Sequence, residues 1–472
     1  MAAFFSRSEI VMSKQNALAG VRRHLSEGHF EADLRRRVAI RSESQDPDKK
    51  GELTRYLREE IEPALLRMDF ECQAIDNPGG GGPLLFASRH EGAQLPTVLT
   101  YGHGDVVLGY DEQWREGLGP WALTLEGDRW YGRGTADNKG QHSINLAALE
   151  QVIKARQGRL GFNVKVLFET GEECGSPGLR EVCTTHRALL KADVFIASDG
   201  PRLNDRRPTI FLGSRGSALF SLEVKARDKG LHSGNWGGVM ANPAVVLSNA
   251  LASLVDQHGR IRCRTLVPSA IPDSVRAAIA DLNIDEHSLG RTLDAGWGEP
   301  GLTLGERLFG WNTLEILAFT AGNPSKPVNA IPPSAIAHCQ LRFVVGTDWQ
   351  QLETLLRQHL DAEGFEQVRV VINRCTPATR LDPDNRWVRF AKASMAQASP
   401  RQLAVLPNLA GTLPNDIFSD VLGLPTLWIP HSYPGCSQHA PDEHMLGEVI
   451  LEGLEIMTSI FWDLGQLQQP SE

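Results

Sequence analysis

The 472-residue sequence contains no uninterrupted apolar run approaching the ~20 residues of a membrane span. It contains no lysine- or arginine-rich run either, and its net charge of −9 is the opposite of the basic footprint that nucleic-acid binding requires. The start of the chain has too short an apolar patch and too early an acid for a secretory signal. We therefore expect a cytoplasmic protein that binds neither nucleic acid nor membrane.

Disulfide patterns are absent as well. The seven cysteines are odd in number, scattered, and include no CxxC pair, which indicates free thiols. The hydrophobic content of 41% and the charged content of 22% are those of a globular protein. A chain of this length is too long for one ordinary core and predicts two or three domains.

Two glycine-bearing runs lack the residues that would make them nucleotide-binding loops. The run Asn77–Pro83 is followed by no Lys-Ser/Thr pair, and the Gly132-x-Gly134 pair lacks the third glycine of a dinucleotide fingerprint. We therefore interpret the first run as a turn and reject a nucleotide cofactor for the second.

Two adjacent carboxylates, Glu172 and Glu173, follow the apolar run Val164–Phe168, which is typical of a strand. Neighbouring residues on an extended chain point to opposite faces, so one carboxylate can hold a cation while the other faces the space beside it. A metal-assisted hydrolase needs this layout. The simpler alternative is a pair of solvated loop acids.

A histidine and an acid stand two positions apart after the predicted strand Val98–Tyr101. Asp105 can accept the second ring N–H of His103, which fixes the tautomer and raises the basicity of a metal ligand. A lone histidine after a strand is more often a core or surface residue, whereas His-x-Asp suits a ligand.

Further ligand-type side chains stand at the ends of other predicted strands or loops, namely Asp137, Asp199 and His439. Asp137 precedes a helix predicted over 141–156 and is alternatively only its N-cap. In open α/β sheets the ligand crevice lies at the carboxyl ends of the strands. We therefore expect these residues to converge there with His103 and the glutamate pair.

The chain changes character between about 216 and 376. The predicted elements there follow the order βαββαβ of a ferredoxin-like unit, with strands over 218–226, 314–320, 334–345 and 367–373 and helices over 243–257 and 348–363. We predict an α/β domain made of residues 1–215 and 377–472, with a second domain inserted at 216–376.

Six motifs, in this order, resemble the M20 metallopeptidases, a family that includes carboxypeptidases, carnosinase-type dipeptidases, acetylornithine deacetylases and desuccinylases. They are Gly102–Val106, Tyr131–Gly140, Gly171–Glu173, Ser198–Gly200, Leu231–Gly234 with Gly237 and Gly238, and His439–Glu443. The resemblance spans nearly the whole chain and leans towards the carnosinase-type dipeptidases. It implies a di-metal α/β catalytic domain with a mixed sheet flanked by helices, and an inserted ferredoxin-like α+β lid and dimerisation domain.

The resemblance also implies which residues bind metal. The implied ligands are His103 and Asp199 for one ion and Glu173 and His439 for a second, with Asp137 bridging both. Zn²⁺ is the expected metal, with Mn²⁺ or Co²⁺ as alternatives, because mixed imidazole and carboxylate ligands suit such ions. Asp105 would orient His103, and Glu172 would be the general base.

Residues of the inserted domain receive implied roles as well. His232 resembles a family histidine that reaches the active site of a partner subunit and stabilises the tetrahedral oxyanion, which predicts a homodimer formed through the lid. Asn329 and Arg342 resemble substrate contacts, with Arg342 gripping a carboxylate. Gly411 and Thr412, beyond the inserted domain, are further expected substrate contacts. Arg342 is alternatively a surface charge on a lid strand.

The expected activity is hydrolysis of amide bonds in short peptides, as in a dipeptidase or carboxypeptidase. An N-acyl amino acid deacylase is the alternative, because a dipeptidase must recognise a free amine whereas a deacylase must accept an acyl group. Asn138 and the run Ala410–Pro414 depart from the family pattern and leave the subfamily open. A catalytically idle binding protein of the same fold would have lost the base or a ligand, and none is lost.

Overall fold

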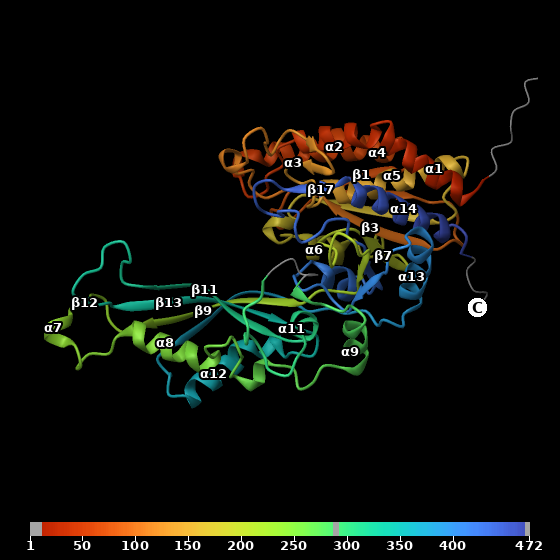
Figure 1. The fold of residues 1–472 in the computed structure, drawn as a ribbon. Helices are drawn as coiled ribbons and strands as arrows, with labels where there is room; N and C mark the ends of the chain where they lie inside the picture. The colour runs from red at the N-terminus through yellow and green to blue at the C-terminus, as the bar shows by residue number, and fades with distance from the viewer. Residues whose placement is uncertain (1–11, 287–291, 468–472) are drawn as a thin grey trace, which may run out of the picture. The chain divides into compact units, whose positions relative to one another are not determined.

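The computed structural model describes residues 12–286 and 292–467. They form two compact units (Figure 1). Unit 1 contains the chain up to Ile210 together with 384–404 and the chain from Ile417 onward, and unit 2 contains Phe211–Pro383 and Val405–Asp416. The chain thus leaves unit 1 and returns to it, as an inserted domain requires.

Unit 1 is built on a mixed sheet with the strand order β1-β2-β6-β3-β7-β16-β8-β15. Its strands are β1 (Glu71–Ile75), β2 (Leu84–Arg89), β3 (Thr97–His103), β6 (Asn163–Glu169), β7 (Val194–Ala197), β8 (Thr209–Phe211), β15 (Ala404–Leu406) and β16 (Thr426–Trp428). The central strands β6, β3, β7 and β16 are parallel, whereas β1 and β2 are antiparallel to their neighbours. A smaller sheet holds β4 (Thr124–Glu126), β5 (Arg129–Tyr131) and β17 (His444–Leu446).

The central strands are apolar and buried along almost their whole length, because helices cover a parallel sheet. The helices of unit 1 are α1 (Lys14–Ser26), α2 (His29–Ala39), α3 (Lys50–Tyr56), α4 (Glu62–Leu66), α5 (Lys139–Ala155), α6 (Leu179–Thr185), α13 (Arg386–Ala398) and α14 (Gly447–Leu464). Helix α5 packs against α1, α2 and α14 (Figure 1), which explains why nearly all of its residues are buried.

Unit 2 contains a four-stranded antiparallel sheet in the order β11-β13-β9-β14. The elements are β9 (Gly216–Lys225), β10 (Leu231–His232), α7 (Ser233–Trp236), α8 (Pro243–Leu254), α9 (Asp273–Ala280), α11 (Leu304–Phe309), β11 (Thr313–Ala321), β12 (Ala330–Ile331), β13 (Ser334–Phe343), α12 (Leu352–Ala362) and β14 (Arg369–Thr376). The strands of the main sheet and helices α8 and α12 follow the predicted βαββαβ order. This arrangement confirms the predicted α/β fold class with its ferredoxin-like insertion.

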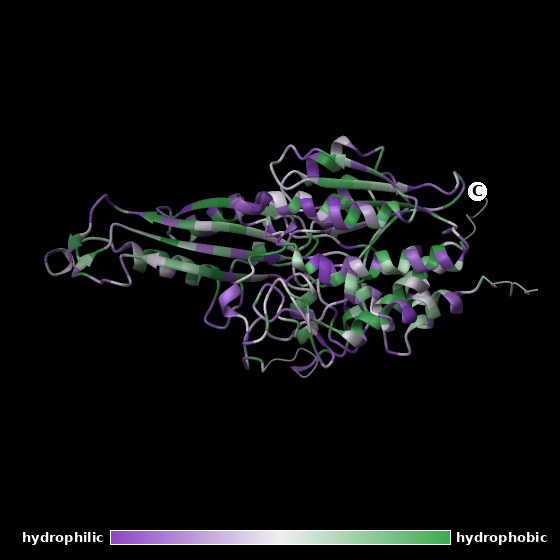
Figure 2. Ribbon diagram, turned by 90° about the horizontal axis from the view of Figure 1, so that it is seen from above, coloured by the Kyte–Doolittle hydropathy of each residue, from purple (hydrophilic) through white to green (hydrophobic). Residues whose placement is uncertain are grey.

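One face of this sheet forms the core of unit 2. Buried and less buried residues alternate along β13 and most of β9, as the two-residue period of a half-covered strand demands. Figure 2 shows hydrophobic and hydrophilic residues interspersed along the strands. The buried residues pack against Leu247 and Leu251 of α8 and Leu356 and Leu360 of α12.

The limits of unit 2 are wider than the predicted 216–376. The segment 405–416 belongs to unit 2 because its backbone is hydrogen-bonded to residues at the start of that unit. The Arg215 guanidinium donates a hydrogen bond to the Ala410 carbonyl at 2.7 Å, and the Leu409 amide donates to the Gly213 carbonyl at 2.8 Å. Contacts between segments so distant in the sequence leave no local pattern.

All seven cysteines are free, as predicted, and four of them, Cys183, Cys263, Cys339 and Cys436, are buried. Across residues 12–286 and 292–467, no helix combines the length and the apolar character needed to cross a membrane.

Candidate metal centre

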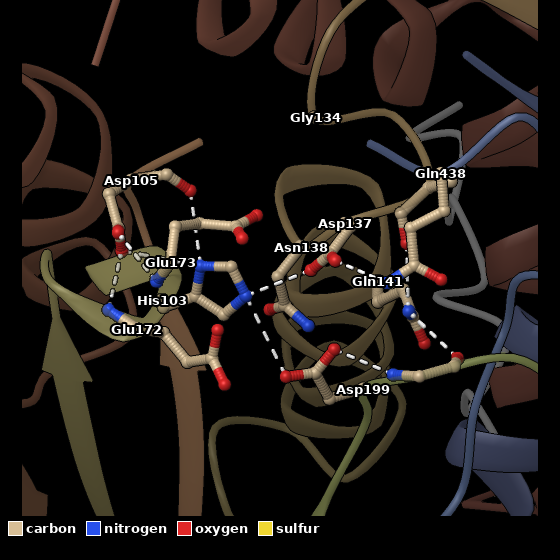
Figure 3. A network of polar contacts seen from close by, with 12 residues as sticks. His103, Asp105, Gly134, Asp137, Asn138, Gln141, Glu172, Glu173, Asp199 and Gln438 are labelled. Atoms are coloured by element: carbon tan, nitrogen blue, oxygen red, sulfur yellow. Dashed lines mark hydrogen bonds and ion pairs between the residues drawn. The ribbon is translucent and has the colours of Figure 1, made fainter. Parts of the chain in front are cut away.

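His103 is the last residue of β3, at the carboxyl end of the parallel strands, and its side chain is fully buried. The ring Nε2 lies 2.9 Å from Oδ1 of Asp137 and 3.6 Å from Oδ2 of Asp199. On the other side of the ring, Nδ1 lies 3.1 Å from the carbonyl oxygen and 3.3 Å from the carboxylate of Asp105. Asp105 therefore holds the ring with Nε2 facing the other acids (Figure 3).

Asp137 lies between two imidazoles. Its Oδ1 contacts His103, and its Oδ2 lies 2.9 Å from Nε2 of His439. Burial opposes the charged form, but the hydrogen bonds from His103 and His439 hold the pKa of Asp137 well below its usual value. Asn138, not Asp137, is the N-cap residue of α5, so the capping interpretation of the Asp137 side chain is wrong.

The glutamate pair does not lie on extended chain. Strand β6 ends at Glu169, and Glu172–Cys174 form one turn of 3₁₀ helix, which Gly175 closes in the left-handed conformation at φ 84°. The amides of Glu172 and Glu173 donate to the two carboxylate oxygens of Asp105 at 3.2 and 3.1 Å. The expected extended geometry is therefore wrong, and Asp105 fixes both the turn and His103.

The two carboxylates of the turn nevertheless have different surroundings. Oε2 of Glu173 lies 3.1 Å from Nε2 of His439. The carboxylate of Glu172 makes no such contact and reaches toward the space beside His103 and Asp199 (Figure 3). Burial raises the pKa of Glu172 well above its usual value.

Asp199 and Glu173 each have one buried carboxylate oxygen without a hydrogen-bond donor among the described residues. Among the described residues, Oδ2 of Asp199 and Oε1 of Glu173 are buried and accept no hydrogen bond. Burial, together with the charge of Asp137, raises the pKa of Asp199 to about 6 and that of Glu173 to about 7. Buried carboxylates of this kind are stable as anions when a cation is bound.

His439 lies in a loop after β16 and has a left-handed backbone at φ 61°. Its side chain is 52% exposed, unlike the buried His103. The preceding residue, Gln438, donates a hydrogen bond from its side-chain Nε2 to Oδ2 of Asp137. Sequence reasoning missed this contact, and the only signal for it is the position of Gln438 beside a predicted ligand.

The predicted ligands form two sets that share one residue. They are His103, Asp137 and Asp199, and Asp137, Glu173 and His439, and within each set the ligand atoms all lie within 4.8 Å of one another. Imidazole nitrogens and carboxylate oxygens are ligands for Zn²⁺ and similar divalent ions. The donor chemistry and the orphaned oxygens both fit a pair of bound cations.

In unit 2, helix α7 and strand β12 lie at one end of the domain (Figure 1). Strand β10 pairs with β12, so that His232 lies opposite Ala330, and the Ser233 amide donates to the Asn329 carbonyl at 3.0 Å. Both side chains are exposed. A Cβ atom at Gly234 would lie only 3.0 Å from the His232 ring, so glycine leaves room for that ring.

Arg342 lies near the other end of β13, eight positions beyond Ser334. Its Nη1 donates to Oγ1 of Thr412 at 2.6 Å, and Thr412 in turn donates to the Arg215 carbonyl at 2.8 Å. Burial lowers the pKa of Arg342. Arg342 is half-buried, which disfavours the interpretation as a surface charge, and it forms no ion pair within the described residues. Gly411 precedes Thr412 in the same loop.

Comparison with known proteins identifies the family. The sequence profile of peptidase family M20/M25/M40 matches residues 99–463. The chain is 25% identical to the Beta-Ala-His dipeptidase of Rattus norvegicus over 401 residues, which cover 82% of this chain and 80% of that protein. The structure of human carnosine dipeptidase 1 superposes with a TM-score of 0.77 at 23% identity, covering 96% of this chain and all of that one.

A second similar fold is that of the di-peptidase Dug1p from Saccharomyces cerevisiae, with a TM-score of 0.79 at 20% identity over 98% of this chain and 100% of that chain. The profile match spans most of the chain and includes His103, Asp137, the glutamate pair, Asp199 and His439. The chain therefore belongs to peptidase family M20/M25/M40 and is a metal-dependent peptidase.

Proposed function

We propose that this chain hydrolyses the peptide bond of dipeptides and other short peptides with two divalent ions and a general base. The observation that carries the proposal is the pair of ligand sets that share Asp137. His103 and Asp199 would hold one ion, Glu173 and His439 the other, and Asp137 would bridge them. Zn²⁺ is the favoured metal, with Mn²⁺ or Co²⁺ as alternatives.

Bound at these sets, the ions supply activation of a water molecule and polarisation of the substrate carbonyl. Glu172 would accept a proton from the attacking water molecule and donate a proton to the leaving amine. Burial raises the pKa of Glu172, and a raised pKa suits a carboxylate that transfers protons near neutral pH. Asp105 positions the turn that carries Glu172 through the amides of that turn.

The guanidinium of Arg342 is the proposed contact for the substrate carboxylate. It is half-buried and forms no ion pair within the described residues, and Thr412 fixes its direction. An arginine fork can take a carboxylate with two parallel hydrogen bonds. Gly411 and Asn329 are the other proposed substrate contacts.

The geometry of unit 2 supports a role for His232 in a partner subunit. Eight positions of β13 separate Arg342 from the end that carries His232, about 26 Å at ~3.3 Å per residue. A dipeptide is only about 7 Å long. Arg342 and His232 therefore act on one substrate only if they come from two chains, as in a homodimer in which His232 stabilises the oxyanion.

A strand edge that pairs with no other described strand supports the same dimer. Strand β11 lies at the edge of the sheet, and Ile316, Leu317 and Phe319 on it are 44%, 56% and 41% exposed. A long apolar edge strand is a template for pairing with another chain. Two copies of β11 related by a two-fold axis would cover both edges at once.

The names of similar proteins support a dipeptide substrate, because several of these proteins are dipeptidases by name, including a Cysteinylglycine-S-conjugate dipeptidase from Corynebacterium striatum.

We place the enzyme in the cytosol, since its seven cysteines are free.

The test is a substrate panel. Dipeptides and N-acyl amino acids should be assayed with protein loaded with Zn²⁺, Mn²⁺ or Co²⁺ and with the same protein after chelation. We expect dipeptides to be cleaved and chelation to abolish cleavage. Faster cleavage of N-acyl amino acids would establish the deacylase alternative, and two bound ions without turnover on any substrate would indicate an idle binding protein.

A further inference from the structure

A buried ion pair lies next to the loop that carries Asp137 and has no part in the proposed mechanism. Nη1 of Arg133 lies 2.7 Å from Oε2 of Glu443, and both side chains are 1% exposed. The rings of Tyr110 and Trp114 lie 6.0 and 5.7 Å from the guanidinium. A charge pair sheltered in this way keeps a fixed geometry, because water does not compete for its hydrogen bonds.

Glu443 fixes the loop that carries the shared ligand. Its Oε2 accepts a hydrogen bond from the Gly134 amide at 3.1 Å, and its Oε1 accepts from the amides of Ala136 and Asp137 at 2.9 and 3.1 Å. The Gly132 amide donates to the Glu443 carbonyl at 3.0 Å. One residue therefore sets the backbone that ends in Asp137.

The loop that carries His439 closes at the residue after Glu443. The loop is tightly folded, with positive φ angles of 56°, 61° and 61° at Ser437, His439 and Asp442. The next residue after Glu443, His444, donates its amide to the Cys436 carbonyl at 2.9 Å. His439 and Asp137 belong to segments about 300 residues apart in the sequence, and the Glu443 side chain ties these segments together beside their 2.9 Å contact.

The two ligand sets depend on this tie to different degrees. His103 and Asp199 are at most 3% exposed and lie at the ends of the central strands β3 and β7. His439, in the other set, is 52% exposed and stands on a strained loop. We propose that Glu443 is a positioning residue for the second ion, because it holds Asp137 and His439 together. Its loss selectively lowers the affinity for the ion at Asp137, Glu173 and His439.

This inference rests on the proposed two-ion site, and its test measures metal binding, not turnover. In Glu443→Gln one acceptor oxygen becomes an amide that faces N–H donors, while the shape is kept. The metal-free protein should be titrated with Co²⁺ and followed by its visible absorption. We expect the second Co²⁺ to bind about 10–100-fold more weakly than in the wild type and the first to bind within a few-fold.

Glu91 provides a matched control at the opposite end of β6. Its carboxylate is 6% exposed, lies 3.0 Å from Nε of Arg89, and accepts hydrogen bonds from the amides of Leu160 and Gly161 at 2.6 and 2.8 Å. Glu91→Gln therefore removes the same kind of buried pair far from the ligands, and both Co²⁺ ions should bind as in the wild type.

The outcomes separate this inference from the function on which it rests. A wild-type protein that binds only one Co²⁺ overturns the two-ion function and this inference with it. Two ions bound with unchanged affinities by Glu443→Gln, or an equal loss in Glu91→Gln, overturn the inference alone. If Glu443→Gln does not fold, Glu443→Asp replaces it in the test. This variant keeps the charge, and it should lower the affinity for the second Co²⁺ by a smaller factor.

Discussion

Replacing Glu172 with glutamine is expected to lower kcat by a factor of about 10²–10⁴, the usual contribution of a general base. Glutamine keeps the shape of the side chain but cannot take a proton from water. Both ions should stay bound, because the proposed ligand in this turn is Glu173 and not Glu172. Metal content by elemental analysis and kcat on a dipeptide, measured on the same preparation, check this expectation.

Glu181→Gln, at an exposed glutamate of α6, is the control for the change of charge alone. It should leave kcat unaltered. If Glu172→Gln turned over within a few-fold of the wild type with both ions present, Glu172 would be no more than a solvated loop acid and another group would have to move the proton.

Two inactive variants should restore activity when their subunits exchange. His232→Ala removes the proposed oxyanion donor and should lower kcat about 10²–10³-fold. In a heterodimer of His232→Ala with Glu172→Gln, one of the two sites combines the wild-type Glu172 of one chain with the wild-type His232 of the other. A random mixture should therefore recover roughly a quarter of the wild-type activity.

A mixture of Glu172→Gln with Glu172→Ala is the matched control, because no pairing of these chains contains an intact base. It should stay inactive. Heterodimers that are verified by differential tagging and yet show no recovery would mean that His232 acts within its own chain or has no catalytic part, and a sedimenting monomer with full activity would exclude the dimer altogether.

The sequence indicated the proposed ligands best where they stand at the end of a central strand. His103 is the last residue of β3 and Asp199 lies two residues after the end of β7, and parallel neighbours bring such ends to one edge of the sheet. The βαββαβ order of unit 2 could also be predicted, because the apolar residues of its strands and helices recur with the period of each kind of element.

Features that depend on contacts between distant segments could not be predicted from the sequence. The turn at Glu172 depends on Asp105, some 67 positions earlier, and the loop 405–416 joins unit 2 through Arg215. The contact of Gln438 with Asp137 likewise joins segments that only the folded chain brings together. Local propensity carries no information about such pairs.

The most direct test of the two-ion site is anomalous diffraction from crystals grown with Zn²⁺, with data collected on both sides of the zinc absorption edge. We expect two anomalous peaks per chain about 3.5–4 Å apart, with Asp137 between them, one peak beside His103 and Asp199 and the other beside Glu173 and His439. A single peak, or a pair of peaks that does not share Asp137, would contradict the proposed two-ion site.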